Sequence, residues 1–213
     1  MIQLDASENS NKIYMPSLLD QPLRQGEILT NVIQIKLDLD SIETEEVLLD
    51  VITHKYAIVV SQDCDLDWDY KSREEKAKEH KRIPSILLCE ITTVESLSKA
   101  ILELDGTEKI KKSRTWSRIA INKDERYQFF QKVEETQDLA HEGLPELGVD
   151  FKRYFTIPTD ELYLRIKTSE TQRRCCLQSP YLEHFISRFY YFQSRVALPE
   201  EHFSEPEEKG GET

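Results

Sequence analysis

Seven short segments of the chain are rich in β-branched and other apolar residues and are bounded by polar or turn-forming residues. This pattern is typical of β-strands. The predicted strands are residues 27–35, 47–53, 56–61, 85–91, 151–157, 162–166 and 173–178. Three consecutive apolar residues, Ile58, Val59 and Val60, indicate a strand buried on both faces of a sheet. His54 and Lys55 are expected to form the turn that precedes this strand.

Two other segments have the apolar spacing of amphipathic helices. In residues 94–104, apolar side chains recur every three or four positions after a capping-box signal from Thr92 to Glu95. The second helix begins at Ser179 and Pro180, which are favoured at helix starts. It places an aromatic stripe on one face: Tyr181, Leu182, Phe185, Ile186, Phe189 and Phe192. The polar residues 71–80 are expected to form an exposed helix or a mobile insertion, and a further helix is expected from residue 122 through Phe129, Phe130 and Val133.

The length of 213 residues fits one domain, and the mixture of strands and helices indicates an α+β protein. We expect a loosely attached polar arm at residues 1–25 and one domain at residues 26–199, with an insertion at residues 67–83. Residues 200–213 are predicted to be a disordered acidic tail.

The net charge is −12, and residues 200–213 contribute six Glu and one Lys to it. Such a balance argues against a protein that binds duplex DNA, because affinity for DNA comes mainly from Lys and Arg at the phosphates. One basic run is a candidate surface for phosphate or for an acidic partner. It contains Lys109, Lys111, Lys112, Arg114 and Arg118, with Trp116 among them.

The cysteines and the hydropathy pattern suggest a cytoplasmic location. The four cysteines form no C-x-x-C pair, which fits reduced thiols. The longest apolar run, residues 56–60, is far shorter than the roughly 20 residues of a membrane-spanning helix. Cys175 and Cys176 are adjacent, so on a strand their side chains point to opposite faces.

The most unusual local sequence is residues 61–69, directly after the strand predicted to be buried. Ser61, Gln62, Asp63 and Asp65 are candidate binding residues there, because function often lies where a strand releases the chain into a loop. In an extended chain, the alternating carboxylates would share one face: Asp63, Asp65, Asp67 and Asp69. Asp63, Asp65 and Asp67 are therefore candidate ligands of a divalent cation, although the turn glycine and the final Glu of a calcium loop are missing.

Cys64, within this acidic segment, is a candidate nucleophile. A reactive cysteine needs a neighbouring base or positive charge to stabilise its thiolate. The surrounding aspartates have the opposite effect, so a small, half-buried thiol is the competing interpretation.

Part of the chain resembles the MazF/PemK-like toxin barrels of prokaryotes. The resemblance rests on residues 26–29, on residues 57–61 after the break at Lys55, and on residues 86–93, which end in Ile-Thr-Thr. It covers residues 25–93 and implies an SH3-like, bent antiparallel β-barrel with an inserted polar helix and a C-terminal amphipathic helix. Residues 150–153 and 179–185 resemble segments of uncharacterised prokaryotic proteins.

In working members of this family, the resemblance implies metal-independent cleavage of single-stranded RNA. A basic side chain and a hydroxyl flank the scissile phosphate while the ribose 2′-hydroxyl attacks. By position, Lys55 would take the family's arginine site, and Thr92 or Thr93 its hydroxyl site. Lysine lacks the planar fork of arginine, and the aspartates of residues 63–69 would repel RNA.

We therefore expect a protein that acts by binding a protein partner in a toxin, stress or defence system, with eroded catalytic positions and no cofactor. Single-stranded RNA is a second expected ligand. Two alternatives remain open. One is a hydrolase or cation-dependent enzyme centred on Cys64, Asp63 and Asp65. The other is a scaffold that recruits partners through its charged tail and basic run.

Overall fold

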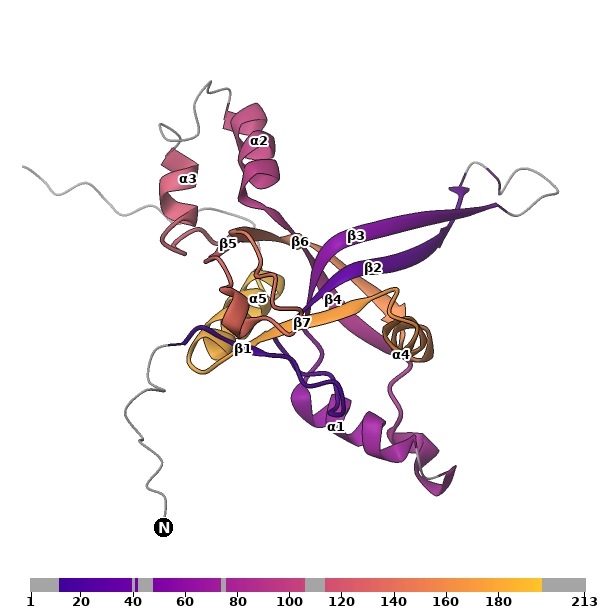
Figure 1. Ribbon diagram of the computed structural model, residues 1–213. Helices are drawn as coiled ribbons and strands as arrows, with labels where there is room; N and C mark the ends of the chain where they lie inside the picture. The colour runs from indigo at the N-terminus through magenta and orange to yellow at the C-terminus, as the bar shows by residue number, and fades with distance from the viewer. Residues whose placement is uncertain (1–11, 40, 42–47, 74–75, 106–113, 197–213) are drawn as a thin grey trace, which may run out of the picture.

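A computed structural model describes residues 12–39, 41, 48–73, 76–105 and 114–196 of the chain. Its strands form one antiparallel sheet in the order β1-β7-β2-β3-β4-β6-β5 (Figure 1). The strands are β1 (Tyr14–Pro16), β2 (Glu27–Leu37), β3 (Leu49–Val59), β4 (Ser85–Thr93), β5 (Tyr127–Phe130), β6 (Leu147–Pro158) and β7 (Gln172–Leu177). The α-helices are α1 (Asp63–Ser72), α2 (Val94–Asp105), α3 (Arg114–Ile119), α4 (Thr159–Lys167) and α5 (Tyr181–Gln193). Two 3₁₀ helices, η2 (Lys76–Lys81) and η4 (Glu135–Gln137), complete the described elements.

The fold is α+β as predicted, but the predicted SH3-like barrel is wrong because the sheet is open. In the described residues, β1 and β5 lie at opposite ends of the strand order and are not paired with each other. The end strand β1 is linked to the segment after β5 by a side chain, since the Tyr14 hydroxyl donates to the Gln131 carbonyl at 2.7 Å. A side-chain link of this kind does not replace the backbone ladder that closes a barrel.

The sheet buries both of its faces. On one face, α5 packs Phe185, Phe189 and Phe192 against a core that includes Phe151 of β6 and Phe130 of β5. The predicted aromatic stripe is thus confirmed as core packing except at Tyr181, which is 37% exposed. On the other face, a second core joins Leu66 of α1 and Leu162 of α4 to Ala57 and Val59 of β3, among others. Burial of neighbouring residues on both sides of β3 is what the run of consecutive apolar residues predicts.

The hairpin β2–β3 changes face at Asn31. In a regular strand, residues three apart point to opposite faces. Leu29 and Val32 nevertheless belong to the same core, and Asn31 between them has a φ of 57°. The same is true of β3, where His54 and Ala57 are three residues apart. His54 stacks on Phe155, and Phe155 packs against the core that holds Ala57, so both residues lie on the same side of the sheet. Each strand therefore rotates at this level. Beyond the rotation, odd-numbered and even-numbered residues point to the opposite faces from those they would have in a regular strand.

Four predicted elements differ from the structure. The turn expected at His54 and Lys55 does not exist: β3 is one continuous strand, and the break in the pattern marks the change of face. Residues 162–166 lie in α4 and not in a strand; Leu162 and Ile166 have the i, i+4 spacing of one helix face. The helix expected after residue 122 is replaced by β5. Residues 14–16, expected in a loose arm, pair with β7 as β1.

Candidate interaction surface and pocket

The distal part of the β2–β3 hairpin projects away from the rest of the sheet (Figure 1). We call this part, residues 32–37 and 49–54, the arm. Within the described residues, β7 pairs with β2 only as far as Thr30, and β4 pairs with β3 only from Tyr56. Both outer edges of the arm therefore have no neighbouring strand, and its two strands pair only with each other.

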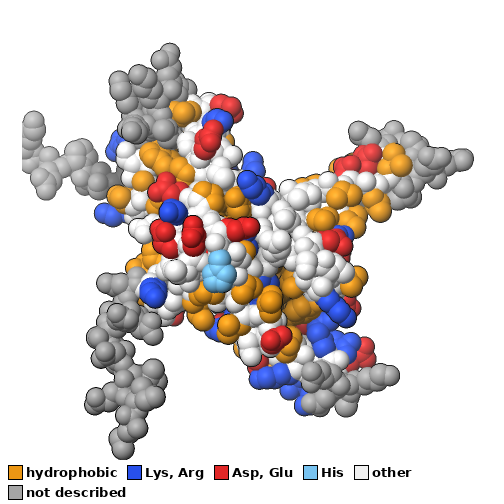
Figure 2. Space-filling model, in the orientation of Figure 1, with side chains coloured by type: hydrophobic (Ala, Val, Ile, Leu, Met, Phe, Trp, Pro, Cys, Tyr) orange, Lys and Arg blue, Asp and Glu red, His pale blue; other side chains and the backbone are white. Residues whose placement is uncertain are grey.

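One face of the arm is apolar and exposed to solvent. The register places Ile35 opposite Val51 and Leu37 opposite Leu49, so these four side chains share a face. Their exposed fractions are 44% for Ile35, 66% for Val51, 42% for Leu37 and 61% for Leu49. Together with Ile33 they form what we call the apolar face. Hydrophobic side chains are visible along the arm in Figure 2. Contiguous exposed apolar surface of this kind marks interaction sites in proteins.

The opposite face of the arm is mixed, and it is anchored at its base. It carries Val32 and Ile52 beside Gln34, Lys36, Asp50 and His54. The His54 ring stacks on Phe155 with 4.0 Å between ring centroids, and its Nε2 lies 3.3 Å from Gln34 Oε1. Its Nδ1 lies 3.4 Å from Glu90 Oε1, and Arg153 contacts the other oxygen of Glu90 at 3.1 Å. The contact with His54, and then that with Arg153, lowers the pKa of Glu90 although partial burial opposes this. These contacts hold the base of the arm and leave its apolar face uncovered.

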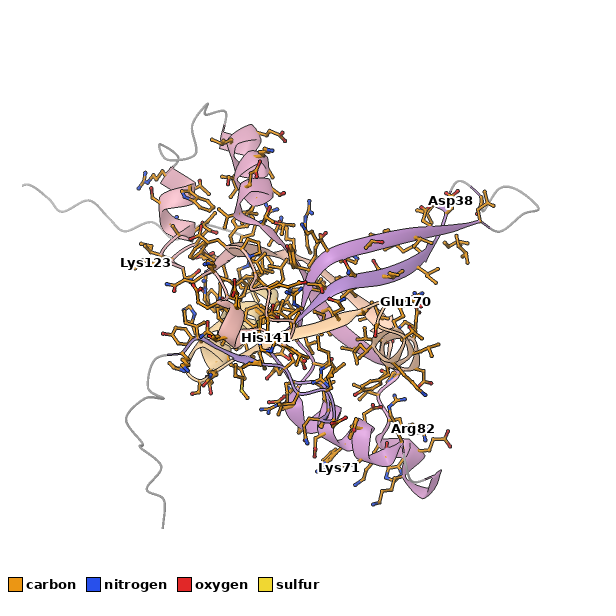
Figure 3. The ribbon with its side chains drawn as sticks, viewed as in Figure 1. Asp38, Lys71, Arg82, Lys123, His141 and Glu170 are labelled. Atoms are coloured by element: carbon orange, nitrogen blue, oxygen red, sulfur yellow. The ribbon has the colours of Figure 1, made fainter. Side chains whose placement is uncertain are left out.

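The sequence that joins the two strands of the arm is rich in acidic residues. Asp38 lies at this end (Figure 3), and its backbone N–H donates to the Leu48 carbonyl at 3.0 Å. From Asp38 to Asp50 the sequence contains six acidic residues and no Lys or Arg. Of these six residues, only Asp38 and Asp50 lie in the part of the chain that the structure describes, and Asp50 is opposite Lys36 in the register of the arm.

Lys55 and Thr92, which the toxin resemblance assigns to catalysis, line different pockets, although they are next in sequence to the paired residues Tyr56 and Ile91 of adjacent strands. Lys55 is exposed, with its Nζ 5.3 Å from the centroid of the Tyr56 ring. Thr92 lines a separate groove of about 320 Å³. Thr93 has a structural role, because its Oγ1 accepts the Ser96 backbone N–H at 3.3 Å and so caps the start of α2.

The acidic segment after β3 is helical, which corrects the expectation that its four aspartates share one face. In α1, Asp63 and Asp67 are four residues apart and lie on one side, whereas Asp65 points away from them. Asp67 pairs with Lys71 at 2.6 Å. Asp69 is fully buried and holds Arg73 at 2.7 Å, so it stabilises the helix end. Within the described ranges, no group of three His, Cys, Asp or Glu side chains is placed to hold a metal ion.

The other candidates of this segment have local contacts. Ser61 Oγ accepts the Leu87 backbone N–H at 2.9 Å, and Gln62 is the residue at the N-terminal cap of α1. The exposed Cys64 thiol has two oxygen neighbours, Gln62 Oε1 at 3.6 Å and Asp65 Oδ1 at 3.8 Å. Both neighbours are acceptors, and neither is the base that a nucleophilic cysteine needs.

The basic run is only partly described. Lys109, Lys111 and Lys112 lie outside the described residues, as does the acidic tail at residues 200–213. Arg114 is exposed on α3, and Trp116 packs against the small core between α2 and α3. None of the helices in the described part of the chain is long and apolar enough to span a membrane.

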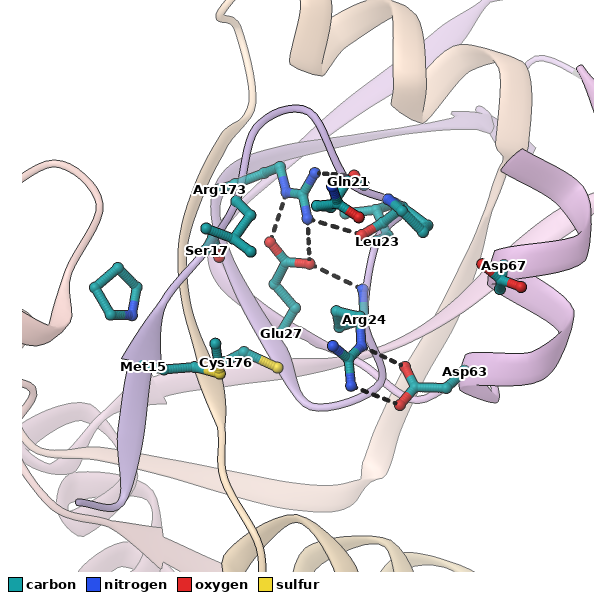
Figure 4. Close-up of a pocket in the computed structure, with 13 residues that line it drawn as sticks. Met15, Ser17, Gln21, Leu23, Arg24, Glu27, Asp63, Asp67, Arg173 and Cys176 are labelled. Atoms are coloured by element: carbon teal, nitrogen blue, oxygen red, sulfur yellow. Dashed lines mark hydrogen bonds and ion pairs between the residues drawn. The ribbon is translucent and has the colours of Figure 1, made fainter. Parts of the chain in front are cut away.

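Asp63 lies at the mouth of a pocket of about 320 Å³ between the β1–β2 loop, β7 and α1 (Figure 4). Asp63 Oδ1 accepts the Gln25 backbone N–H at 2.7 Å, and its carboxylate pairs with the Arg24 guanidinium at 3.2 Å. Deeper in the pocket, Glu27 pairs with Arg173 at 2.6 Å, and both side chains are buried. Arg173 also donates to the Gln21 carbonyl at 2.7 Å, so it ties the loop to the sheet.

Sequence reasoning identified Asp63 but missed its partners. Glu27 and Arg173 are 146 positions apart, and Arg24 is 39 positions from Asp63. A Glu at the start of a predicted strand rich in apolar residues, as at residue 27, is the signal that could have indicated a buried ion pair. The apolar face of the arm was also missed, because alternating Ile33, Ile35 and Leu37 normally indicates a core-facing strand.

Comparison with known proteins gave no match: no family model, no curated protein and no solved structure matches this chain.

Proposed function

We propose that the protein acts by binding, and that the arm docks onto a protein partner that has an apolar groove bordered by Lys and Arg side chains. The exposed apolar face of the arm carries this proposal. The prokaryotic toxin, stress or defence setting implied by the sequence resemblance is retained as the proposed context, and location in the cytoplasm is part of it.

Two features of the arm support a docking role over a structural one. An isolated two-stranded hairpin gains little stability in water, so an extension that exposes four large apolar side chains adds little to the fold itself. Covering the same side chains with a partner removes their apolar surface from water, which favours association. The unpaired edges offer backbone groups to a partner strand in addition.

The charge of the arm supports a basic partner over a second copy of this chain. The sequence from Asp38 to Asp50, which joins the two strands of the arm, has six acidic residues and no basic ones, and the whole chain carries a net charge of −12. Two copies would repel each other, whereas a partner with Lys or Arg around its groove would be attracted and oriented. We therefore expect the free protein to be a monomer in light scattering.

The test compares matched substitutions of equally exposed leucines. Leu49 on the arm and Leu164 on α4 are 61% and 59% exposed. The wild type and the variants Leu49→Ser and Leu164→Ser are used to capture partners from the native cells. The captured protein is then purified and its affinity measured at low and high salt. We expect Leu49→Ser to weaken binding by roughly tenfold or more, Leu164→Ser to leave it unchanged, and salt to weaken it.

Three results would contradict the proposal. The two leucine variants could bind the purified partner equally well, the affinity could be independent of salt, or the free protein could be a dimer that Leu49→Ser dissociates. Cleavage of single-stranded RNA by the wild type that is lost in Lys55→Ala would contradict the non-catalytic part and favour the endoribonuclease activity of the resembled family instead.

A further inference from the structure

The pocket beside Asp63 has the composition of a small-molecule site. Ligand pockets have volumes of about 300–1,000 Å³ and are mostly apolar, with a few placed polar groups. This pocket, at about 320 Å³, has apolar walls from Met15, Leu18, Pro22 and Leu23. Its loop is held by the buried Arg173, which donates to the Gln21 and Pro22 carbonyls at 2.7 and 3.0 Å. The cavity is thus built by a fixed loop.

One polar atom in the pocket wall lacks a partner. Ser17 lines the cavity, is 4% exposed, and its hydroxyl oxygen has no hydrogen-bond partner among the described residues. Its backbone N–H, in contrast, is bonded to the Arg174 carbonyl at 3.2 Å. A buried hydroxyl without a partner is costly, and nearly all such groups in proteins are satisfied. The oxygen exposes less than 1 Å² of surface, so a ligand with one hydrogen-bonding group would satisfy it only after the Ser17 side chain rotates toward the cavity.

The charged groups of the wall already have partners; Glu27 and Asp63 are paired with arginines of the same wall (Figure 4). Glu27 Oε2 accepts from the Arg173 guanidinium and from the Arg24 backbone N–H, both at 2.9 Å. Asp63 is held by the Arg24 guanidinium at 3.2 Å, and Asp67 is held by Lys71 at 2.6 Å. A charged ligand would lose its hydration without gaining a free counter-ion here, so a neutral ligand is favoured.

The Cys176 thiol adds a weakly polar surface and no reactive group. Burial, and then the charge of Glu27, raise the pKa of Cys176 to about 12. At neutral pH it is therefore a protonated thiol, and its Sγ donates to the Gln25 carbonyl at 3.5 Å. The pocket is suited to binding and not to covalent chemistry.

We propose that this pocket binds a small, neutral, mainly apolar molecule, and that the Ser17 side chain rotates toward the cavity so that its Oγ hydrogen-bonds to the single hydroxyl or carbonyl group of this molecule. The site lies on the β1–β7 side of the sheet, away from the arm, and it does not depend on the partner proposed above.

Three probes with the same aromatic body separate the contributions: p-cresol has a hydroxyl, toluene has no polar group, and p-toluate has a carboxylate. Each is titrated into the full chain while the backbone amide signals are followed by NMR. We expect p-cresol to give saturable shifts at pocket residues such as Arg24, Glu27 and Cys176. Toluene is expected to bind several-fold more weakly than p-cresol, and p-toluate is expected to bind at least roughly tenfold more weakly than p-cresol.

Variants assign the effect to the hydroxyl and to the cavity. Ser17→Ala removes only the unpartnered group, so we expect an unchanged or higher Tm, a p-cresol affinity reduced to that of toluene, and an unchanged toluene affinity. Ser194→Ala, which alters an exposed serine after α5, is the matched control and should change nothing. Met15→Trp places a larger side chain in the pocket wall and should block both p-cresol and toluene.

The proposal is overturned if p-cresol causes no saturable shift at the pocket amides, or if p-toluate binds as tightly as p-cresol. It is also overturned if Ser17→Ala keeps the preference for p-cresol over toluene, or if Met15→Trp, with its fold intact by circular dichroism, still binds both probes.

Discussion

Breaking the ion pair between Glu27 and Arg173 should destabilise the protein strongly. Glu27 is completely buried, and the Arg173 side chain is 4% exposed. Removing one partner of such a pair leaves an uncompensated buried charge, which costs about 3–5 kcal/mol. We therefore expect Glu27→Leu and Arg173→Met each to lower the free energy of unfolding by about that amount. Most single substitutions cost about 1 kcal/mol.

The double variant Glu27→Leu/Arg173→Met should be more stable than either single variant. It removes both charges, and replacing a buried pair with apolar residues is often close to neutral. It still leaves the Gln21 and Pro22 carbonyls and the Arg24 N–H without their partners, which costs about 1 kcal/mol each. We expect a net loss of about 2–3 kcal/mol, and a coupling energy of at least about 2 kcal/mol between the two sites.

Urea unfolding monitored by circular dichroism gives the four free energies of this cycle. Hydrogen exchange adds a local measurement: in the double variant, amides of residues 18–25 should exchange faster than in the wild type, because the loop has lost its donors. If the two single losses simply add in the double variant, the energetic reasoning is refuted. If the loop stays protected, Arg173 is not what holds it.

Three further outcomes are expected. Burial opposes ionisation of Asp138, but hydrogen bonds from Arg174 and from backbone N–H groups outweigh it and lower the pKa of Asp138. The stabilisation by the Asp138 carboxylate is therefore present above about pH 4 and is lost as the pH falls through the lowered pKa. Asp138→Asn should flatten the acid side of a plot of urea midpoint against pH. Gly26→Ala should reduce the Tm, because Gly26 has a φ of +77° and the added carbon would lie 2.5 Å from a Leu182 methyl carbon; an unchanged Tm would refute this. Phe185→Ala, at a completely buried site, should cost about 3–5 kcal/mol in urea unfolding, and a loss below 1 kcal/mol would contradict its place in the core.

The elements that the sequence predicts correctly are those with strong, unbroken periodicity. The spacing of the apolar residues from Tyr181 to Phe192 predicts an amphipathic helix, and α5 covers these residues. The opposite orientation of Cys175 and Cys176 is likewise confirmed: Cys175 lies in the core under α5, and Cys176 lines the pocket on the other side. Both predictions depend only on local geometry.

The predictions that fail depend on contacts between distant segments. Whether a sheet closes is decided by its two end strands, and β1 and β5 are more than 100 residues apart in sequence. The pocket combines Arg24 and Glu27 with Asp63 and Arg173, which come from three different parts of the chain. Asp63 was selected because it follows a buried strand, but its role in the pocket depends on Arg24, which no local pattern links to it.

The arm illustrates why a correct local pattern can still give a wrong environment. Alternating apolar residues at 33, 35 and 37 predict a strand with one buried face, and the strand exists. The rotation of the strand at Asn31 then decides to which side of the sheet these apolar residues point. At the same level, β7 stops pairing with β2, and β4 stops pairing with β3. The base of the arm is held by Val32 and by the stack of His54 on Phe155, whereas the apolar face beyond it has no cover among the described residues. An anchored base with an uncovered apolar face fits a surface that gains its cover from another molecule, and this is why binding, and not catalysis, is the function that we propose.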